Sequence, residues 1–215
     1  MIDLESDYHI HANYNDHSSP DLTITNIILR AKSMKLKNIA ITEHVRKSSD
    51  WVEKYVNEIM QSVNNEYDDN DNLNNNLKVI TGFEAKILKN GEIDCHDKYM
   101  KKYFIIASFH TIYNDKSIWL NALKSAIKNP NVDVIGHLAP EQTFTLETNE
   151  IEELADLLRS NNKIIELNAK YCRPPVEIIK IFDKYGVRFH LGSDAHSLHE
   201  IGEFKRLKDL IAAIS

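Results

Sequence analysis

Seven short apolar runs rich in β-branched residues recur along the chain, and segments with helical periodicity separate them. Strands are predicted at residues 8–12, 38–42, 78–83, 103–109, 133–138, 163–168 and 188–192. Helices are predicted at residues 24–34, 51–63, 118–128, 149–159, 176–185 and 200–214. Because strands alternate with helices, the pattern predicts a parallel sheet whose strands are connected by helical crossovers.

The length of the chain fits a barrel. Its 215 residues give seven strand–helix units of about 31 residues each, close to the value for an eight-unit barrel of roughly 250 residues. We therefore expect an α/β fold, a distorted seven-stranded (β/α)7 TIM-like barrel, with an open doubly wound sheet as the alternative. No internal repeat or linker is evident in the sequence, which predicts one domain over residues 1–215. The polar residues 68–76 are predicted to form an exposed loop.

The composition limits the class of protein. The chain is 42% hydrophobic and 27% charged, as in soluble globular proteins, and no apolar run approaches the roughly 18 residues of a membrane span. Its net charge of -6 disfavours binding to nucleic acid, which requires an excess of Lys and Arg. The first residues are acidic, unlike a secretory signal, and the 2 cysteines cannot form a disulfide framework. We therefore expect a cytoplasmic protein, and the sequence leaves its oligomeric state open.

Side chains that can ligate metals stand at or just after the C-terminal end of nearly every predicted strand. They are His9, His11, His17, His44, Glu84, His110, His137, Asp194 and His196. In a parallel barrel all of these strand ends open on one face, where barrel enzymes build their active sites. Side chains two residues apart on a strand point to the same side, so His9 and His11 are expected to face the barrel mouth together.

Imidazole and carboxylate groups in this arrangement predict a site for divalent metal ions such as zinc, manganese or iron. One ion takes about four to six donors, so these ligands predict two to three metals, with Glu84 free to bridge two of them. Closely spaced metals stabilise both the attacking and the leaving oxygen of an in-line displacement. The pattern therefore favours hydrolysis of a phosphoester.

These residues stand in short motifs that recur together. The motifs are Tyr-His-Ile-His at 8–11, His17, Ile-Thr-Glu-His at 41–44, Gly-Phe-Glu at 82–84, Ser-Phe-His at 108–110, Gly-His at 136–137 and Gly-Ser-Asp-Ala-His at 192–196. The set resembles the PHP family, whose name joins polymerase and histidinol phosphatase. Members of that family share a distorted seven-stranded barrel with a trinuclear metal site, so the resemblance implies one metal-dependent phosphoesterase domain.

The resemblance also implies how the ligands divide among the metals. The first metal would be held by His9, His11, Glu84 and Asp194, the second by Glu84, His110 and His137, and the third by His17, His44 and His196. A metal-bridging hydroxide would then attack phosphorus while the third metal holds the phosphate. Glu43 stands where the family often has Asp, and it is expected to orient a ligand or to help protonate the leaving group.

Cations in the loops beyond the strand ends are candidates for binding the substrate phosphate. Arg173 follows the sixth predicted strand, and its guanidinium can hold phosphate oxygens in a bidentate manner. Together with Glu43 and Asp194, Arg173 completes the predicted catalytic set. Arg46 and Lys47 follow the second strand, where solvated surface cations are the simpler interpretation.

Other polar residues near the mouth receive structural interpretations. Glu166 and Asn168 are expected to support the ligands from inside the barrel rather than to bind metal. His190 lies within the last strand and is predicted to be a buried structural histidine. His96 is predicted to belong to local surface structure, although Cys95 precedes it, and Cys172 is not predicted to be a nucleophile.

The predicted function is that of a metal-dependent phosphatase acting on a small phosphomonoester similar to histidinol phosphate. The alternatives are a nucleotide phosphatase, a 3'-5' exonuclease, a protein-tyrosine phosphatase and a non-catalytic metal-binding accessory domain. The acidic balance disfavours long nucleic acids. The full set of ligands disfavours the non-catalytic alternative.

Overall fold

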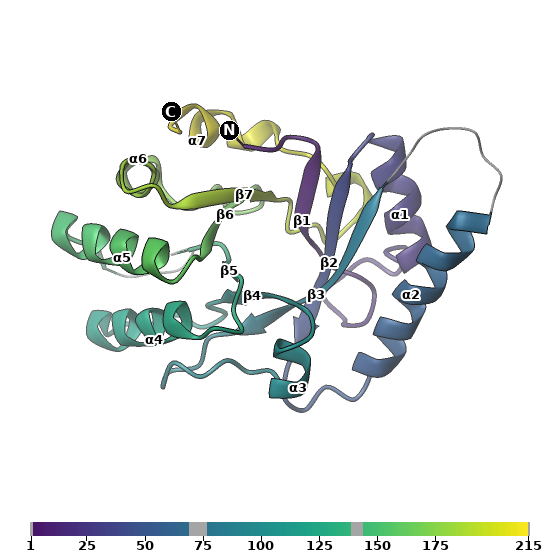
Figure 1. The fold of residues 1–215 in the computed structure, drawn as a ribbon, viewed down its shortest axis with the longest axis horizontal. Helices are drawn as coiled ribbons and strands as arrows, with labels where there is room; N and C mark the ends of the chain where they lie inside the picture. The colour runs from purple at the N-terminus through teal and green to yellow at the C-terminus, as the bar shows by residue number, and fades with distance from the viewer. Residues whose placement is uncertain (1, 69–76, 139–143, 215) are drawn as a thin grey trace.

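The computed structural model describes residues 2–68, 77–138 and 144–214. Its seven parallel strands follow one another in chain order and curve into a nearly closed barrel (Figure 1). The strands are β1 (Ser6–Ile10), β2 (Asn38–Val45), β3 (Lys78–Lys86), β4 (Phe104–Ser108), β5 (Val134–Ile135), β6 (Ile164–Asn168) and β7 (Arg188–Gly192). The predicted TIM-like barrel is confirmed, and the open doubly wound sheet is excluded.

Helices surround the strands on the outside (Figure 1). They are α1 (Ile24–Ser33), α2 (Val52–Asp68), α3 (Asp97–Met100), α4 (Lys116–Lys128), α5 (Thr148–Ser160), α6 (Val176–Lys184) and α7 (Lys208–Ala212). Local signals set several of their ends. The Thr23 side chain accepts a hydrogen bond from the Asn26 amide at the start of α1, and α4 ends at Asn129 because the following residue is proline. The sequence did not predict α3, whose four residues are too few to show helical periodicity.

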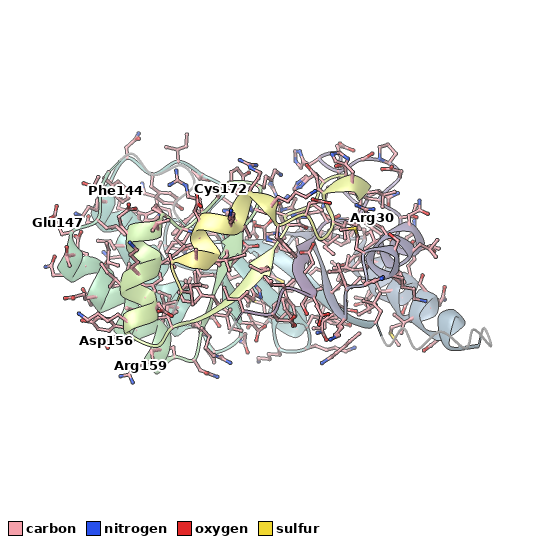
Figure 2. All side chains as sticks on the ribbon, turned by 90° about the horizontal axis from the view of Figure 1, so that it is seen from above. Arg30, Phe144, Glu147, Asp156, Arg159 and Cys172 are labelled. Carbon is pink, nitrogen blue, oxygen red and sulfur yellow. The ribbon has the colours of Figure 1, made fainter. Side chains whose placement is uncertain are left out.

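The prediction of one continuous helix over residues 200–214 is wrong. This segment contains part of a 3-10 turn (Leu198–Glu200), a second 3-10 turn (Lys205–Leu207) and then the short α7. Gly202 lies between the two turns with φ +72, a left-handed conformation that ends a right-handed helix. The Arg30 side chain on α1 donates a hydrogen bond from Nε to the Leu198 carbonyl at 3.2 Å, which ties α1 to this segment (Figure 2).

Asp7 closes the barrel between its first and last strands. Its carboxylate is fully buried and accepts hydrogen bonds from the amides of Ser193 at 2.9 Å and His9 at 3.3 Å. The Gly202 amide also donates to it, at 2.9 Å. One carboxylate thus connects β1 to the end of β7 and holds the left-handed turn that interrupts the C-terminal segment.

Replacing Asp7 with alanine is expected to lower the free energy of unfolding by about 3 kcal/mol, because it leaves buried amide groups without acceptors. Urea denaturation followed by circular dichroism measures the change. Asp209→Ala is the matched control, since Asp209 is exposed on α7 and its loss is expected to change stability by about 0.5 kcal/mol or less. Equal stability of the two variants would contradict this role of Asp7.

Among the residues described, no helix is long and apolar enough to cross a membrane. Of the loop predicted at residues 68–76, Asp68 is the last residue of α2, and the rest lies outside the described residues. Buried polar residues are concentrated toward the C-terminal ends of the strands, as His9, Glu43, Glu84 and Glu166 show. Buried ionisable groups need partners that stabilise their charge. The strand ends where these groups gather form the mouth of the barrel.

Candidate metal centre

A cavity of about 540 Å³ opens at the barrel mouth. The predicted ligands that line it are His17, His44, Glu84, His110, His137, Asp194 and His196. His9 and His11 are fully buried and contact these residues. The structure therefore brings all of the predicted ligands to one end of the barrel, although they come from distant parts of the chain.

The Glu84 carboxylate lies at the centre of this group. Its Oε1 is 2.8 Å from His137 Nε2 and 3.0 Å from His110 Nε2. Its Oε2 is 2.8 Å from His44 Nδ1, 3.5 Å from His9 Nε2 and 3.6 Å from His11 Nε2. Each oxygen thus faces a separate set of imidazoles, which is the arrangement required of a carboxylate that bridges two ions.

His9 in β1 and His11, which follows the end of β1, point the same way, as their spacing predicted. His9 Nε2 and His11 Nε2 are 3.1 Å apart in the buried interior. Two nitrogens that ligate one ion at about 2.1 Å stand roughly 2.9–3.4 Å apart in octahedral or tetrahedral geometry. The Asp194 carboxylate, 3.3 Å from His11 Nε2, extends the same set of donors. The spacing of these atoms fits the ligands of a shared divalent metal.

The turn after β7 presents Asp194 and His196 to the cavity. Asp194 has φ +55, and its amide donates to the His9 carbonyl at 2.8 Å, which fixes the turn against β1. The Asn168 side chain donates to Asp194 Oδ2 at 3.1 Å and leaves Oδ1 facing His11. The His196 ring lies 4.3 Å from the His11 ring, centroid to centroid.

Three overlapping groups have ligand atoms close enough to share an ion. They are His9, His11 and Glu84; His44, Glu84 and His110; and His11, His44 and His196. His17 belongs to none of these groups among the described residues. It is exposed, and its ring meets the His44 ring edge-on at 6.1 Å.

Buried carboxylates behind the cluster orient its histidines. Glu166 Oε1 is 2.6 Å from His9 Nδ1, and its Oε2 accepts the His137 amide at 2.6 Å. Glu43 accepts the backbone amides of Ala12 at 2.9 Å and His44 at 2.7 Å, and its Oε1 lies 3.6 Å from His11 Nδ1. Both carboxylates hold ligand residues from the side away from the cavity.

Charge within the cluster controls the protonation of its members. Burial by itself would lower the pKa of His9, but the charges of Glu166 and Glu84 raise this pKa well above its ordinary value. Burial opposes ionisation of Glu84 too, yet the surrounding histidines hold the pKa of Glu84 well below its ordinary value. Burial and the charge of His11 lower the pKa of His196 to about 4. Ionised carboxylates and neutral imidazoles are the forms that ligate metals, so a bound metal would have to displace the proton that the raised pKa keeps on His9.

The cations that line the cavity are Arg46, Lys86 and Lys170. Lys170 Nζ lies 2.9 Å from His196 Nδ1 and 3.6 Å from Asp194 Oδ1. Arg173 is half-buried, its backbone pairs with Asn168, and it is not among the described residues that line the cavity. Lys170 was not predicted from the sequence, although its position two residues after the end of β6 is the signal that would have found it.

The structure places the residues that received structural interpretations as follows. His190 is buried, and its ring stacks on Tyr8 with centroids 5.0 Å apart. His96 is exposed beside the start of α3. The Cys172 sulfur lies near the Ala169 carbonyl at 3.7 Å and close to the C-terminal segment (Figure 2).

A parallel barrel with clustered imidazoles and carboxylates at its mouth is typical of metal-dependent hydrolases. Residues 7–170 match the PHP domain. The chain belongs to the PHP domain family, which confirms the resemblance seen in the sequence.

Similar proteins agree with this assignment. A protein of Caldicellulosiruptor saccharolyticus named "Probable phosphatase" is 29% identical over 97% of this chain and 87% of its own length. Another of that name, from Acetivibrio thermocellus, is 31% identical over 64% of this chain and 61% of its own length. The histidinol phosphate phosphatase of Lactococcus lactis, solved in complex with zinc, L-histidinol and phosphate, shares the fold with a TM-score of 0.70 and 21% identity, covering 100% of this chain and 93% of that one. Family, relatives and site identify the chain as a metal-dependent phosphatase.

Proposed function

We propose that the protein hydrolyses a small phosphomonoester with two to three divalent metals held at the barrel mouth. The observation that carries this proposal is the position of Glu84, whose two oxygens each face a different set of imidazoles. A cavity of about 540 Å³ is of the size that takes a small molecule. The Lactococcus lactis enzyme, which binds L-histidinol and phosphate in zinc-containing crystals, supports a substrate of this size.

The proposed ligand sets are those of the PHP family. The contacts support the first two sets, whereas His17 lies outside the clustered groups of the described residues. The first ion would be held by His9, His11, Glu84 and Asp194, the second by Glu84, His110 and His137, and the third by His17, His44 and His196. Zinc, manganese and iron all suit such donors. Bound divalent metals supply Lewis acidity and a nucleophile at neutral pH.

The protein's own residues position these groups and the substrate. Glu166 fixes the ring of His9, and Asn168 orients Asp194 so that its other oxygen faces the cluster. Glu43 acts as a positioning residue behind His11, because its oxygens already accept hydrogen bonds inside the protein. Lys170 and Arg46 face the cavity and would hold the phosphate oxygens, while Arg173 would contribute if its side chain turns toward the mouth.

In the proposed reaction a water oxygen bonds to phosphorus as the bond from phosphorus to the leaving oxygen breaks. One proton of the water ends on the leaving oxygen, so the products are inorganic phosphate and an alcohol. The ammonium of Lys170, near Asp194 and His196, is placed to balance negative charge that develops on the phosphoryl oxygens. A cytoplasmic location belongs to the same proposal.

The test is hydrolysis of para-nitrophenyl phosphate by protein loaded with zinc or manganese. Chelation is expected to remove activity and re-addition of metal to restore it. His9→Ala is expected to lower kcat/KM by about 10²–10³-fold, because it removes a buried ligand. His199→Ala is the matched control, since His199 is exposed, and it should retain activity. Full metal occupancy without turnover would overturn the proposed function.

A further inference from the structure

A second cavity of about 520 Å³ lies beside the metal centre. The segment after β3 lines one side of it with Lys86, Leu88 and Lys89, and the segment 111–118 lines the other. Lys86 lines both this cavity and the one at the barrel mouth. The two cavities therefore share Lys86 in their linings.

The position of Lys86 follows from its strand. It is the last residue of β3 and stands two residues after Glu84, so its side chain leaves the strand on the same side as the Glu84 carboxylate. Lys86 is half-buried, and no carboxylate in the described part of the chain pairs with its amino group. The more deeply buried Lys163 differs, because its Nζ donates to the carbonyls of Asn129 and Val132. A partly desolvated ammonium without an internal partner is suited to binding an anion.

The charges around both cavities are predominantly positive. The carboxylates that line the first cavity are Glu84 and Asp194, and both are buried against histidines. The carboxylate that lines the second is Asp115, whose Oδ1 accepts the amides of Ser117 at 2.9 Å and Ile118 at 3.1 Å at the start of α4. These carboxylates are engaged within the protein, and the hydrogen bond from Ser117, helped by the charge of Lys89, lowers the pKa of Asp115. Arg46 and Lys86 line the cavities without a carboxylate partner among the described residues.

The second cavity also offers apolar contact. Leu88 and Ile118 line it, and Ile112, which is 57% exposed, adds an apolar side chain at its edge. Cavities that bind small ligands combine apolar walls with a few polar groups. The cavity thus combines two ammonium groups with an apolar wall.

We infer that the substrate carries a second anionic group, a carboxylate or a second phosphate, which Lys86 and Lys89 bind in the second cavity. The inference rests on the proposed function, because it describes the leaving-group side of the same phosphomonoester. Lys86 is therefore a specificity-determining residue. A leaving group with a cationic amine, such as that of histidinol phosphate, would meet like charge in this cavity.

Four aryl phosphates that differ in the para substituent test the inference on the zinc-loaded protein. They carry a carboxylate, the isosteric carboxamide, an aminomethyl group and a second phosphate. We expect kcat/KM to be about tenfold higher for the carboxylate than for the carboxamide, the effect of one charged hydrogen bond, and lowest for the aminomethyl compound. The ratio between the carboxylate and the bisphosphate shows which anion is preferred.

Three variants test whether the preference for an anion arises at Lys86. Lys86→Gln is expected to bring the carboxylate-to-carboxamide ratio to near one. Lys180→Gln should keep the wild-type ratio, because Lys180 is exposed on α6. Lys89→Gln tests the same cavity at an exposed position if Lys86→Gln does not fold. An unchanged ratio in Lys86→Gln or a preference for the aminomethyl compound would overturn the inference.

Calorimetry with the corresponding phosphonates separates this inference from the proposed function. Binding that favours the carboxylate over the carboxamide, without turnover of any phosphate, would support the second anion site and overturn the proposed phosphatase. Turnover of all four phosphates at equal rates would support the phosphatase and overturn the second anion site.

Discussion

Glu84→Gln is expected to lower kcat/KM by about 10⁴-fold. Glu84 Oε1 lies 2.8 Å from His137 Nε2, and Oε2 lies 2.8 Å from His44 Nδ1, so one carboxylate serves two ligand sets. Glutamine keeps the size of the side chain but removes its charge and replaces one acceptor oxygen with a donor. The variant should therefore lose at least one bound metal, which elemental analysis of the purified protein measures.

Glu166→Gln provides the graded comparison for Glu84→Gln. Glu166 is buried as deeply and contacts His9 at 2.6 Å, but it acts on the site through His9 and His137. A loss of about 10–100-fold is expected for a group that orients a ligand. Equal losses in the two variants, with unchanged metal content in Glu84→Gln, would contradict the bridging role of Glu84.

Gly192→Ala is expected to remove activity and to lower the free energy of unfolding by about 4 kcal/mol. A Cβ atom at this position would lie 2.0 Å from Glu166 Oε1 and 2.8 Å from His9 Cβ. Neither neighbour can move freely, because the Glu166 carboxylate holds the ring of His9 and the amide of His137. The added methyl group would displace the carboxylate and misplace two ligands, as thermal denaturation and kcat/KM together would show.

Gly186→Ala is the control for Gly192→Ala, because it separates steric crowding by the added Cβ atom from strain in the backbone. Gly186 has φ +73, but an added Cβ would meet its nearest atom, Arg159 Cδ, at 3.9 Å. Only the left-handed conformation opposes alanine there, at a cost of about 1–2 kcal/mol, and the metal site is expected to keep its activity. An active and stable Gly192→Ala variant would show that the Glu166 carboxylate is not fixed in place.

Much of the fold could be predicted because each strand and each helix of the barrel has its own periodic pattern of apolar residues in the sequence. The seventh strand was predicted at the residues where it forms, and the spacing of His9 and His11 correctly placed both rings on one side. The C-terminal helix was predicted wrongly because a single glycine does not interrupt the pattern of apolar residues. The left-handed conformation of Gly202 nevertheless ends the helix. The Gly202 amide donates to Asp7, a residue nearly two hundred positions away in the sequence.

The candidate site, like the fold, could be predicted from the sequence only in part. The ligand-type residues could be predicted because metals require imidazole and carboxylate donors, and these stand at strand ends. Lys86 and Lys170 were missed because a lysine near a strand end is ordinarily solvated surface. Arg173, the cation that the sequence favoured, is not among the described residues that line the cavity.

The sequence by itself determined the barrel class, the family and the chemical nature of the ligands, because periodicity and donor type are local properties of the chain. Tertiary structure alone decided which donors meet around Glu84, which carboxylate closes the barrel, and which lysine lines both cavities. Each of these depends on contacts between residues far apart in the sequence, and such contacts exist only once the strands have curved into a barrel.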